Sequence, residues 1–153
     1  MPTIQKLIPD DASVLSELLK KQSSQYRKSF FPFEVESEKA LFKLLLNCSR
    51  DCYWGIWHQT QIVGFFMLRG WDLGFDIPSF GVLVDEKQRR KGLATLALLT
   101  AISYCRLENV PELMLKVDPV NESAYKIYEA FKFKKTGICS QHGHVIMNLK
   151  LEH

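Results

Sequence analysis

A short basic turn between an apolar strand and an apolar helix is the part of the sequence best suited to chemistry. Four cations fall within the five positions from Lys87 to Lys91, and Gly92 and Ala94 follow them. The first amides of a helix have no intrahelical partners, and the helix dipole is positive at that end. Glycine has no β-carbon, so a ligand can approach the backbone closely. The turn therefore predicts an anion site, and a pyrophosphate is a natural fit.

The spacing of the glycines excludes the commoner phosphate motifs. The chain contains neither GxxxxGK[ST], the P-loop pattern, nor GxGxxG, the dinucleotide-binding pattern. A solvated basic turn and a nucleic-acid patch remain as alternatives. The basic run is short, it follows the acidic pair Asp85-Glu86, and no aromatic residue interleaves with it. We therefore expect no nucleic acid as a partner.

The elements around the turn must hold it in place. Phe80 to Val84 is expected to be a strand, and Gly92 to Leu107 a long helix that is apolar nearly all round. A helix of that kind is predicted to be buried against a sheet. Glu112 to Val117 alternates as a strand does, and Asn121 can cap a short helix whose apolar residues share one face.

The remaining segments complete a mixed α/β sandwich. Helices are expected after Asp10-Asp11 and after Ser37. Further strands are predicted at Thr3 to Ile8, Tyr53 to Trp57, Ile62 to Leu68, Lys134 to Cys139 and His144 to Leu149. The short turn after Trp57 predicts an antiparallel hairpin. The strand-helix-strand unit from Phe80 to Val117 predicts a parallel or splayed pair.

The turn and the segment from Asn121 to Phe133 resemble the sequence motifs of a known family. Arg89-x-x-Gly92-x-Ala94 is similar to the R/Q-x-x-G-x-G/A signature of the GNAT superfamily of acyl-CoA-dependent N-acyltransferases. The run after the next strand is also similar to that family, from Asn121 through Ala124-x-x-x-Tyr128-x-x-x-x-Phe133. Lys132 departs from the glycine that is usual before the final Phe, which concerns helix termination. The resemblance implies one GNAT-like domain with a mixed, mostly antiparallel sheet, a splayed parallel pair and helices on both faces.

The resemblance also implies roles for individual residues. The pantetheine arm of acetyl-CoA would pair with Val82, Leu83 and Val84. The Asn121 position commonly contacts the cofactor, and the Tyr128 position often acts as the general acid that protonates the departing thiolate. The residues implied to bind around the pyrophosphate are Arg89, Arg90, Lys91, Gly92, Leu93, Ala94 and Thr95.

The implied reaction moves an acetyl group from acetyl-CoA, as co-substrate, to a primary amine by direct attack. A small-molecule acceptor is favoured, and an amino sugar is one candidate, because the segment from Gly70 to Gly81 resembles acetyltransferases of surface-polysaccharide gene clusters. The alternatives are a protein or peptide N-acetyltransferase and a non-catalytic acyl-CoA-binding regulatory module. A basic interaction domain is a further alternative outside the family.

Three carboxylates are candidates for the general base or for binding the amine. Asp72 and Asp76 lie in the loop before the predicted cofactor strand, and Glu34 follows an aromatic segment. An acid near the acceptor can bind a cationic amine or take its proton. Simple solvation is the alternative for each. The aromatic residues Tyr26, Phe30, Phe31, Phe33 and Trp71 are expected either to pack in the core or to line an acceptor pocket.

Length and composition set the broad class. The 153 residues, 46% hydrophobic and 24% charged with a net charge of +3, suit one globular domain. We place that domain at residues 1–150 and interpret Leu151, Glu152 and His153 as vector-derived tag residues. No apolar run is long enough for a membrane span and no signal-peptide core is present, so a cytoplasmic location without a membrane partner is expected.

The cysteines and histidines give no metal site in the sequence. The four cysteines form no CxxC pair, and we expect free thiols. His142-Gly143-His144 lacks a nearby third ligand, so we predict no bound metal. The assembly is expected to be a monomer or a homodimer.

Overall fold

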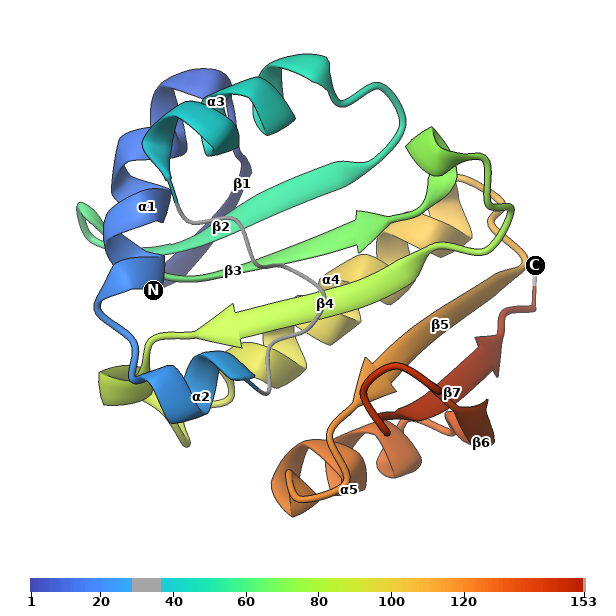
Figure 1. The fold of residues 1–153 in the computed structure, drawn as a ribbon. Helices are drawn as coiled ribbons and strands as arrows, with labels where there is room; N and C mark the ends of the chain where they lie inside the picture. The colour runs from blue at the N-terminus through green and yellow to red at the C-terminus, as the bar shows by residue number, and fades with distance from the viewer. Residues whose placement is uncertain (29–36, 153) are drawn as a thin grey trace.

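A seven-stranded mixed sheet with the strand order β1-β2-β3-β4-β5-β7-β6 forms the centre of the protein (Figure 1). The computed structural model describes residues 1–28 and 37–152. All neighbouring strands are antiparallel except β4 and β5, which are parallel. The strands are β1 (Pro2–Lys6), β2 (Cys52–His58), β3 (Gln61–Arg69), β4 (Ser79–Val84), β5 (Glu112–Val117), β6 (Lys134–Ile138) and β7 (Val145–Lys150).

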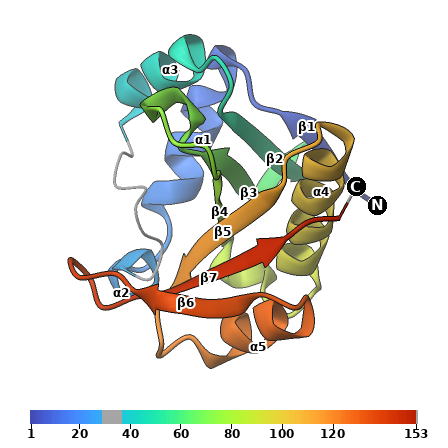
Figure 2. The ribbon, with the colours of Figure 1, turned by 90° about the vertical axis from the view of Figure 1, so that its right-hand side faces the viewer.

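Helices cover both faces of the sheet. Figure 2 shows α1 and α3 on one face and α4 and α5 on the other. The helices are α1 (Ala12–Lys20), α2 (Ser24–Lys28), α3 (Glu38–Asn47), α4 (Leu93–Leu107) and α5 (Glu122–Ala130), with 3-10 turns η1 (Pro9–Asp11), η2 (Trp71–Leu73) and η3 (Glu86–Gln88). Within the described ranges no helix has the length and apolar character needed to cross a membrane. The predicted fold class is confirmed.

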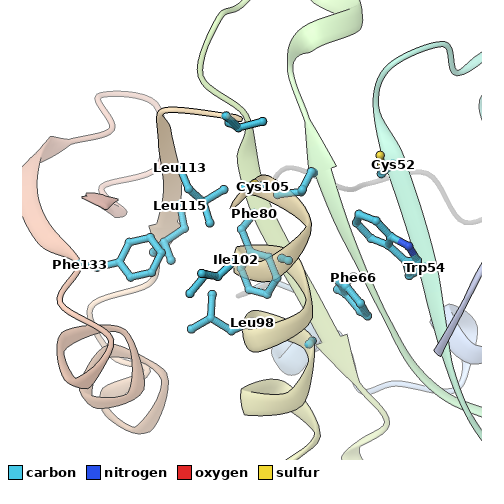
Figure 3. Close-up of a cluster of buried hydrophobic side chains, with 14 of the residues drawn as sticks. Cys52, Trp54, Phe66, Phe80, Leu98, Ile102, Cys105, Leu113, Leu115 and Phe133 are labelled. Carbon is cyan, nitrogen blue, oxygen red and sulfur yellow. The ribbon is translucent and has the colours of Figure 1, made fainter. Parts of the chain in front are cut away.

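Alternation along the strands sends side chains into a separate core on each face. Leu83 of β4 packs with Leu15 and Leu41 of α1 and α3, whereas its neighbour Val82 packs toward α4. The core under α4 joins Phe66 of β3 to Leu115 of β5. Figure 3 shows this cluster, including Trp54, Phe80, Leu98, Ile102, Cys105, Leu113 and Phe133. The helix α4 therefore packs on both halves of the sheet.

The parallel pair separates soon after it begins. Only Ser79 with Met114 and Phe80 with Leu115 are paired, although β4 runs on to Val84. The carboxyl ends of β4 and β5 point apart, toward α2 and α5 (Figure 1). The predicted splayed pair is thus present, and its open end lies next to the basic turn that follows β4.

Three local features refine the expectations. The helix α4 is buried against the sheet as predicted, and its outer side leaves Leu99 48% exposed and Leu107 82% exposed. The pattern of small and large apolar residues indicates burial without showing which side faces the sheet. A short helix, α2, lies between α1 and α3, where the sequence predicted no element. Leu151 is buried, and its amide donates to the carbonyl of Pro111 (2.9 Å), so the packed fold continues past residue 150.

The departure at Lys132 has a visible backbone consequence. Lys132 follows α5 with a φ of +75°, the left-handed conformation that glycine adopts at little cost. Its amide still closes the helix by donating to the Glu129 carbonyl (2.9 Å). The chain therefore makes the usual helix ending with a residue that has to bear the strain of a β-carbon.

Replacing Lys132 by glycine should stabilise the protein by about 1 kcal/mol, because the substitution removes this strain at a helix end. Chemical denaturation of the wild type and of Lys132→Gly measures the difference. Lys132→Ala is the matched control, since alanine keeps the β-carbon and should leave the free energy of unfolding nearly unchanged. Equal stability of the glycine and alanine variants would show that the backbone is not strained here.

Candidate active site

The turn from Arg89 to Gly92 exposes backbone at the start of α4. Arg90 and Gly92 both have left-handed φ angles, +63° and +79°. Gly92 is the N-cap, and no side chain caps the helix there. The first helical bond comes from Leu96 to the Gly92 carbonyl (3.0 Å), which leaves the amides of the three preceding residues outside the helical ladder. An ideal β-carbon on Gly92 would meet no atom within 4 Å. The space in front of these amides is open.

The edge of β4 beside the turn carries a second set of backbone groups. The Pro78 carbonyl accepts from Met114 of β5 (3.0 Å), and the Asp85 amide donates to Val63 of β3 (2.8 Å). Backbone groups of successive strand residues point to opposite sides. The N–H and C=O of Val82 and Val84 therefore point into the gap between β4 and β5, where no β5 residue pairs with them.

Tyr26 of α2 reaches the end of this edge. Its hydroxyl oxygen lies 2.7 Å from the Val84 carbonyl oxygen, to which it donates, and 3.3 Å from the Val84 amide nitrogen. The Arg89 guanidinium lies over the tyrosine ring, 4.2 Å from its centroid. Tyr26 thus contacts both the strand edge and the first arginine of the turn. Burial raises the pKa of Tyr26, so its hydroxyl stays protonated at neutral pH.

Polar contacts hold the α1–α2 junction against η3. Asp85 is 5% exposed and pairs with the Lys21 ammonium at 2.9 Å. Gln22 is buried; its side chain donates to Asp85 (3.4 Å) and accepts from the Glu86 amide (2.9 Å). The backbone N–H and hydroxyl of Ser23 both donate to the Glu86 carboxylate. We call the contacts of Lys21, Gln22, Ser23 and Tyr26 with residues 84–89 the clasp.

Tyr128 of α5 approaches the same gap from the other side. It is half-buried and packs edge-on against Phe133, with ring centroids 5.9 Å apart. Burial raises the pKa of Tyr128, and the nearby Tyr26 side chain raises it further. The Tyr128 hydroxyl therefore keeps its proton through neutral and mildly alkaline pH. The helices that carry the two tyrosines, α2 and α5, lie at the diverging ends of β4 and β5 (Figure 1).

The cap of α5 forms as predicted. The Asn121 side-chain oxygen accepts from the Ala124 amide at 3.3 Å. Ala124, Ile127, Tyr128 and Phe131 share the face that packs on the core. A contact between Asn121 and a cofactor stays a prediction.

The loop before β4 lies away from the turn. Asp72 and Asp76 are exposed and precede Ser79, and the five steps from Ser79 to Val84 cover about 17 Å of strand. The structure does not bring either carboxylate to the open gap. Roles for them as base or amine ligand stay predictions, and Glu34 lies outside the described residues together with Phe30, Phe31 and Phe33.

The Asp72 side chain bonds to the segment that follows α3. Its carboxylate accepts from the backbone amides of Ser49 (2.9 Å), Arg50 (2.8 Å) and Asp51 (3.3 Å). These bonds outweigh desolvation and lower the pKa of the carboxyl. Trp71, also a candidate pocket residue, is 8% exposed and packs in the core beneath Arg50, whose guanidinium is 4.7 Å from its ring.

Sequence reasoning missed the clasp. Tyr26 was considered only as a core or pocket aromatic, and Asp85-Glu86 only as acids next to the basic run. Nothing in their local sequence indicates partners about 60 positions away. No group of three or more His, Cys, Asp or Glu side chains in the described ranges is arranged to hold a metal ion.

The comparisons with known proteins agree with this geometry. The sequence model of the acetyltransferase (GNAT) family matches residues 16–133, which is most of the chain. The chain belongs to this family. It is 28% identical over 103 residues to human N-acetyltransferase 8 and 25% identical over 92 residues to N-acetylaspartate synthetase of Xenopus tropicalis. These matches cover 62% and 60% of the chain but only 44% and 34% of the two relatives, so the chain spans less than half of either.

Solved structures of this family share the fold over nearly the whole chain. The PaiA N-acetyltransferase of Thermoplasma acidophilum, solved with coenzyme A, has a TM-score of 0.78 at 19% identity, with 99% of each chain covered. The ribosomal-protein-S18-alanine N-acetyltransferase of Escherichia coli has a TM-score of 0.77 at 20% identity, covering 100% of this chain and 96% of its own. Spermidine N-acetyltransferase of Vibrio cholerae, solved with CoA and spermine, has 0.80 at 17% identity, covering 97% and 95%.

Removing the Asp85 charge should weaken the clasp in a pH-dependent way. The amide and ammonium donors around Asp85 lower its pKa below the usual 3.8. Its stabilisation is therefore fully present above that pH and is lost as the pH falls through the lower folded value. Asp85→Asn should cost about 1–2 kcal/mol at pH 7, as measured by chemical denaturation.

The stabilities of wild type and Asp85→Asn should converge in acid, because the wild-type carboxylate is then protonated. Asp76→Asn, which alters an exposed loop carboxylate, is the matched control and should have little effect at either pH. If the free energies of unfolding of wild type and Asp85→Asn differed by the same amount at pH 7 and in acid, the ionic role of Asp85 would be contradicted.

Proposed function

We propose that the protein is an N-acetyltransferase that moves an acetyl group from acetyl-CoA to a primary amine. The observation that carries the proposal is a pair of backbone sites at one end of the gap. One is the β4 edge at Val82 and Val84, which β5 does not pair, and the other is the first amides of α4. A ligand with an amide-bearing arm and a pyrophosphate can bond to both sites. Acetyl-CoA has both parts in that order.

The residues present fit such a ligand. Gly92 leaves open space in front of amides that no described side chain caps, which suits phosphate oxygens. Arg89, Arg90 and Lys91 add positive charge at the same turn. Along the gap, Val82 offers one donor and one acceptor to the pantetheine amides, and Val84 offers the same pair once the Tyr26 hydroxyl leaves it. Coenzyme A in the solved PaiA and spermidine acetyltransferase structures supports the assignment by fold.

Acetyl-CoA would supply a thioester, whose carbonyl carbon is the electrophile. The amine nitrogen forms a bond to that carbon as the carbon–sulfur bond breaks. Tyr128 gives its hydroxyl proton to the sulfur and recovers the proton that the nitrogen loses, so the protons balance. The Tyr128 hydroxyl is protonated at neutral pH, as a general acid must be. Backbone N–H groups at the β4 edge can polarise the carbonyl oxygen.

We favour a small-molecule amine as acceptor. Named neighbours act on both kinds of acceptor, spermidine in one case and the alanine of a ribosomal protein in another. A panel has to include both classes for that reason. An amino sugar remains the candidate suggested by the segment Gly70 to Gly81.

Gly92→Val should abolish measurable binding of CoA while leaving the fold intact. A β-carbon and its methyl groups would project into the open space in front of the α4 amides, where phosphate oxygens are expected. The left-handed φ of +79° adds strain of about 1–2 kcal/mol. Isothermal titration with CoA and a thermal melt measure the two effects separately.

Gly74→Val provides the matched control. Gly74 also has a left-handed φ, +93°, with nothing within 4 Å of its ideal β-carbon, but it lies in the loop at the opposite end of β4. The Gly74→Val variant should lose about as much stability as Gly92→Val does and should keep the wild-type affinity for CoA. Retained CoA binding by Gly92→Val would refute the turn as the pyrophosphate site.

Free-thiol release from acetyl-CoA in the presence of an amine panel tests the reaction itself. The panel contains amino sugars, polyamines, amino acids and lysine peptides. At least one amine should release thiol faster than the buffer alone. For that amine, Tyr128→Phe should lower kcat about 100-fold, the size expected for losing a general acid, with little change in the Kd for CoA.

Tyr125→Phe, on the same helix, is the control and should keep the wild-type rate. An unchanged kcat in Tyr128→Phe would make Tyr128 a packing residue. CoA binding without thiol release for any amine would favour the non-catalytic regulatory module.

A further inference from the structure

The Tyr26 hydroxyl takes up the backbone groups that the proposed ligand needs at the end of β4. It donates to the Val84 carbonyl (2.7 Å) and lies 3.3 Å from the Val84 amide. Both groups point into the gap between β4 and β5. A pantetheine amide cannot bond to Val84 while the hydroxyl is there, because two ligands would share one space.

Arg89 is engaged by the same side chain. Its guanidinium is 4.2 Å from the Tyr26 ring centroid and 3.9 Å from the Glu86 carboxylate. The guanidinium would have to give up part of these contacts to bind a phosphate fully, although its side chain is 52% exposed. Tyr26 therefore competes at two points, Val84 and the turn.

The way α2 is attached to the rest of the protein would allow the Tyr26 side chain to move away from Val84. The firm contacts of the clasp lie before the helix, at Lys21, Gln22 and Ser23. The helix α2 has only five residues, Ser24–Lys28, and such a short helix gains little stability of its own. Beyond its own turn, Tyr26 makes polar contacts with Val84 and Arg89, and its ring packs at the edge of the core under α1 and α3.

We propose that Tyr26 is a plug that closes the pantetheine edge of the free protein and is displaced when acetyl-CoA binds. This inference rests on the proposed function, since the displacing ligand is the proposed co-substrate. Displacement frees Val84 for the pantetheine arm and Arg89 for the phosphates in one movement.

The affinity of Tyr26→Phe for desulfo-CoA tests the plug. Phenylalanine keeps the ring under Arg89 but removes both contacts with Val84. Without that competition the variant should bind desulfo-CoA about tenfold more tightly than wild type, as measured by isothermal titration. Tyr104→Phe is the matched control, because the Tyr104 hydroxyl is also bonded, by Cys52 at 3.4 Å, and a lysine also lies over its ring. That variant should bind as wild type does.

Nitration of the wild type with tetranitromethane gives a second measurement that needs no variant. Mass spectrometry should show more nitration of Tyr26 when saturating desulfo-CoA is present, because displacement exposes the ring, and no change at Tyr104. Weaker or equal binding by Tyr26→Phe, or stronger protection of Tyr26 in the complex, would overturn the plug and leave the proposed function standing. Failure of the wild type to bind desulfo-CoA would overturn both.

Discussion

The separation of β4 from β5 is the constraint on which the site depends. Two pairs of residues connect the strands, and beyond Phe80 no residue of β4 pairs with β5. Unpaired strand groups inside a sheet are costly unless something else bonds to them. In the free protein Tyr26 does so at Val84, and the proposed co-substrate would do so along the whole edge. The opening is thus a surface made of backbone groups, and the proposed co-substrate would need few specific side chains to bind there.

Much of the fold follows from local patterns in the sequence. Alternation predicted the strands β3, β4 and β5 within a residue or two, and Ser37 and Asn121 cap α3 and α5 as expected. The bare turn at Gly92 was also predictable, because glycine and the change from strand to helix occur within a few positions. Such features depend on neighbours in the chain, and a sequence displays those directly.

Features that depend on distant residues were not predictable in the same way. Asp72 resembled a loop acid near an acceptor, but its carboxylate binds three amides at the end of α3, more than 20 positions earlier. Tyr26 belonged to an aromatic segment with no sign of its partner Val84. The exposed side of α4 was only weakly marked, because Leu99 and Leu107 lie on it together with the polar residues Ser103 and Arg106.

The helix α4 has a mechanical role that follows from its position under the gap. Its buried residues contact the core of β2, β3 and β4 as well as that of β5 and β7, so it bridges a boundary that the sheet barely crosses. Without such a bridge, the last three strands and α5 could unfold as an independent unit. With it, both parts share one core, and cooperative unfolding of the whole domain is the expected behaviour. The helix whose amino end is proposed to bind the co-substrate is also the element that makes the two halves of the sheet a single folding unit.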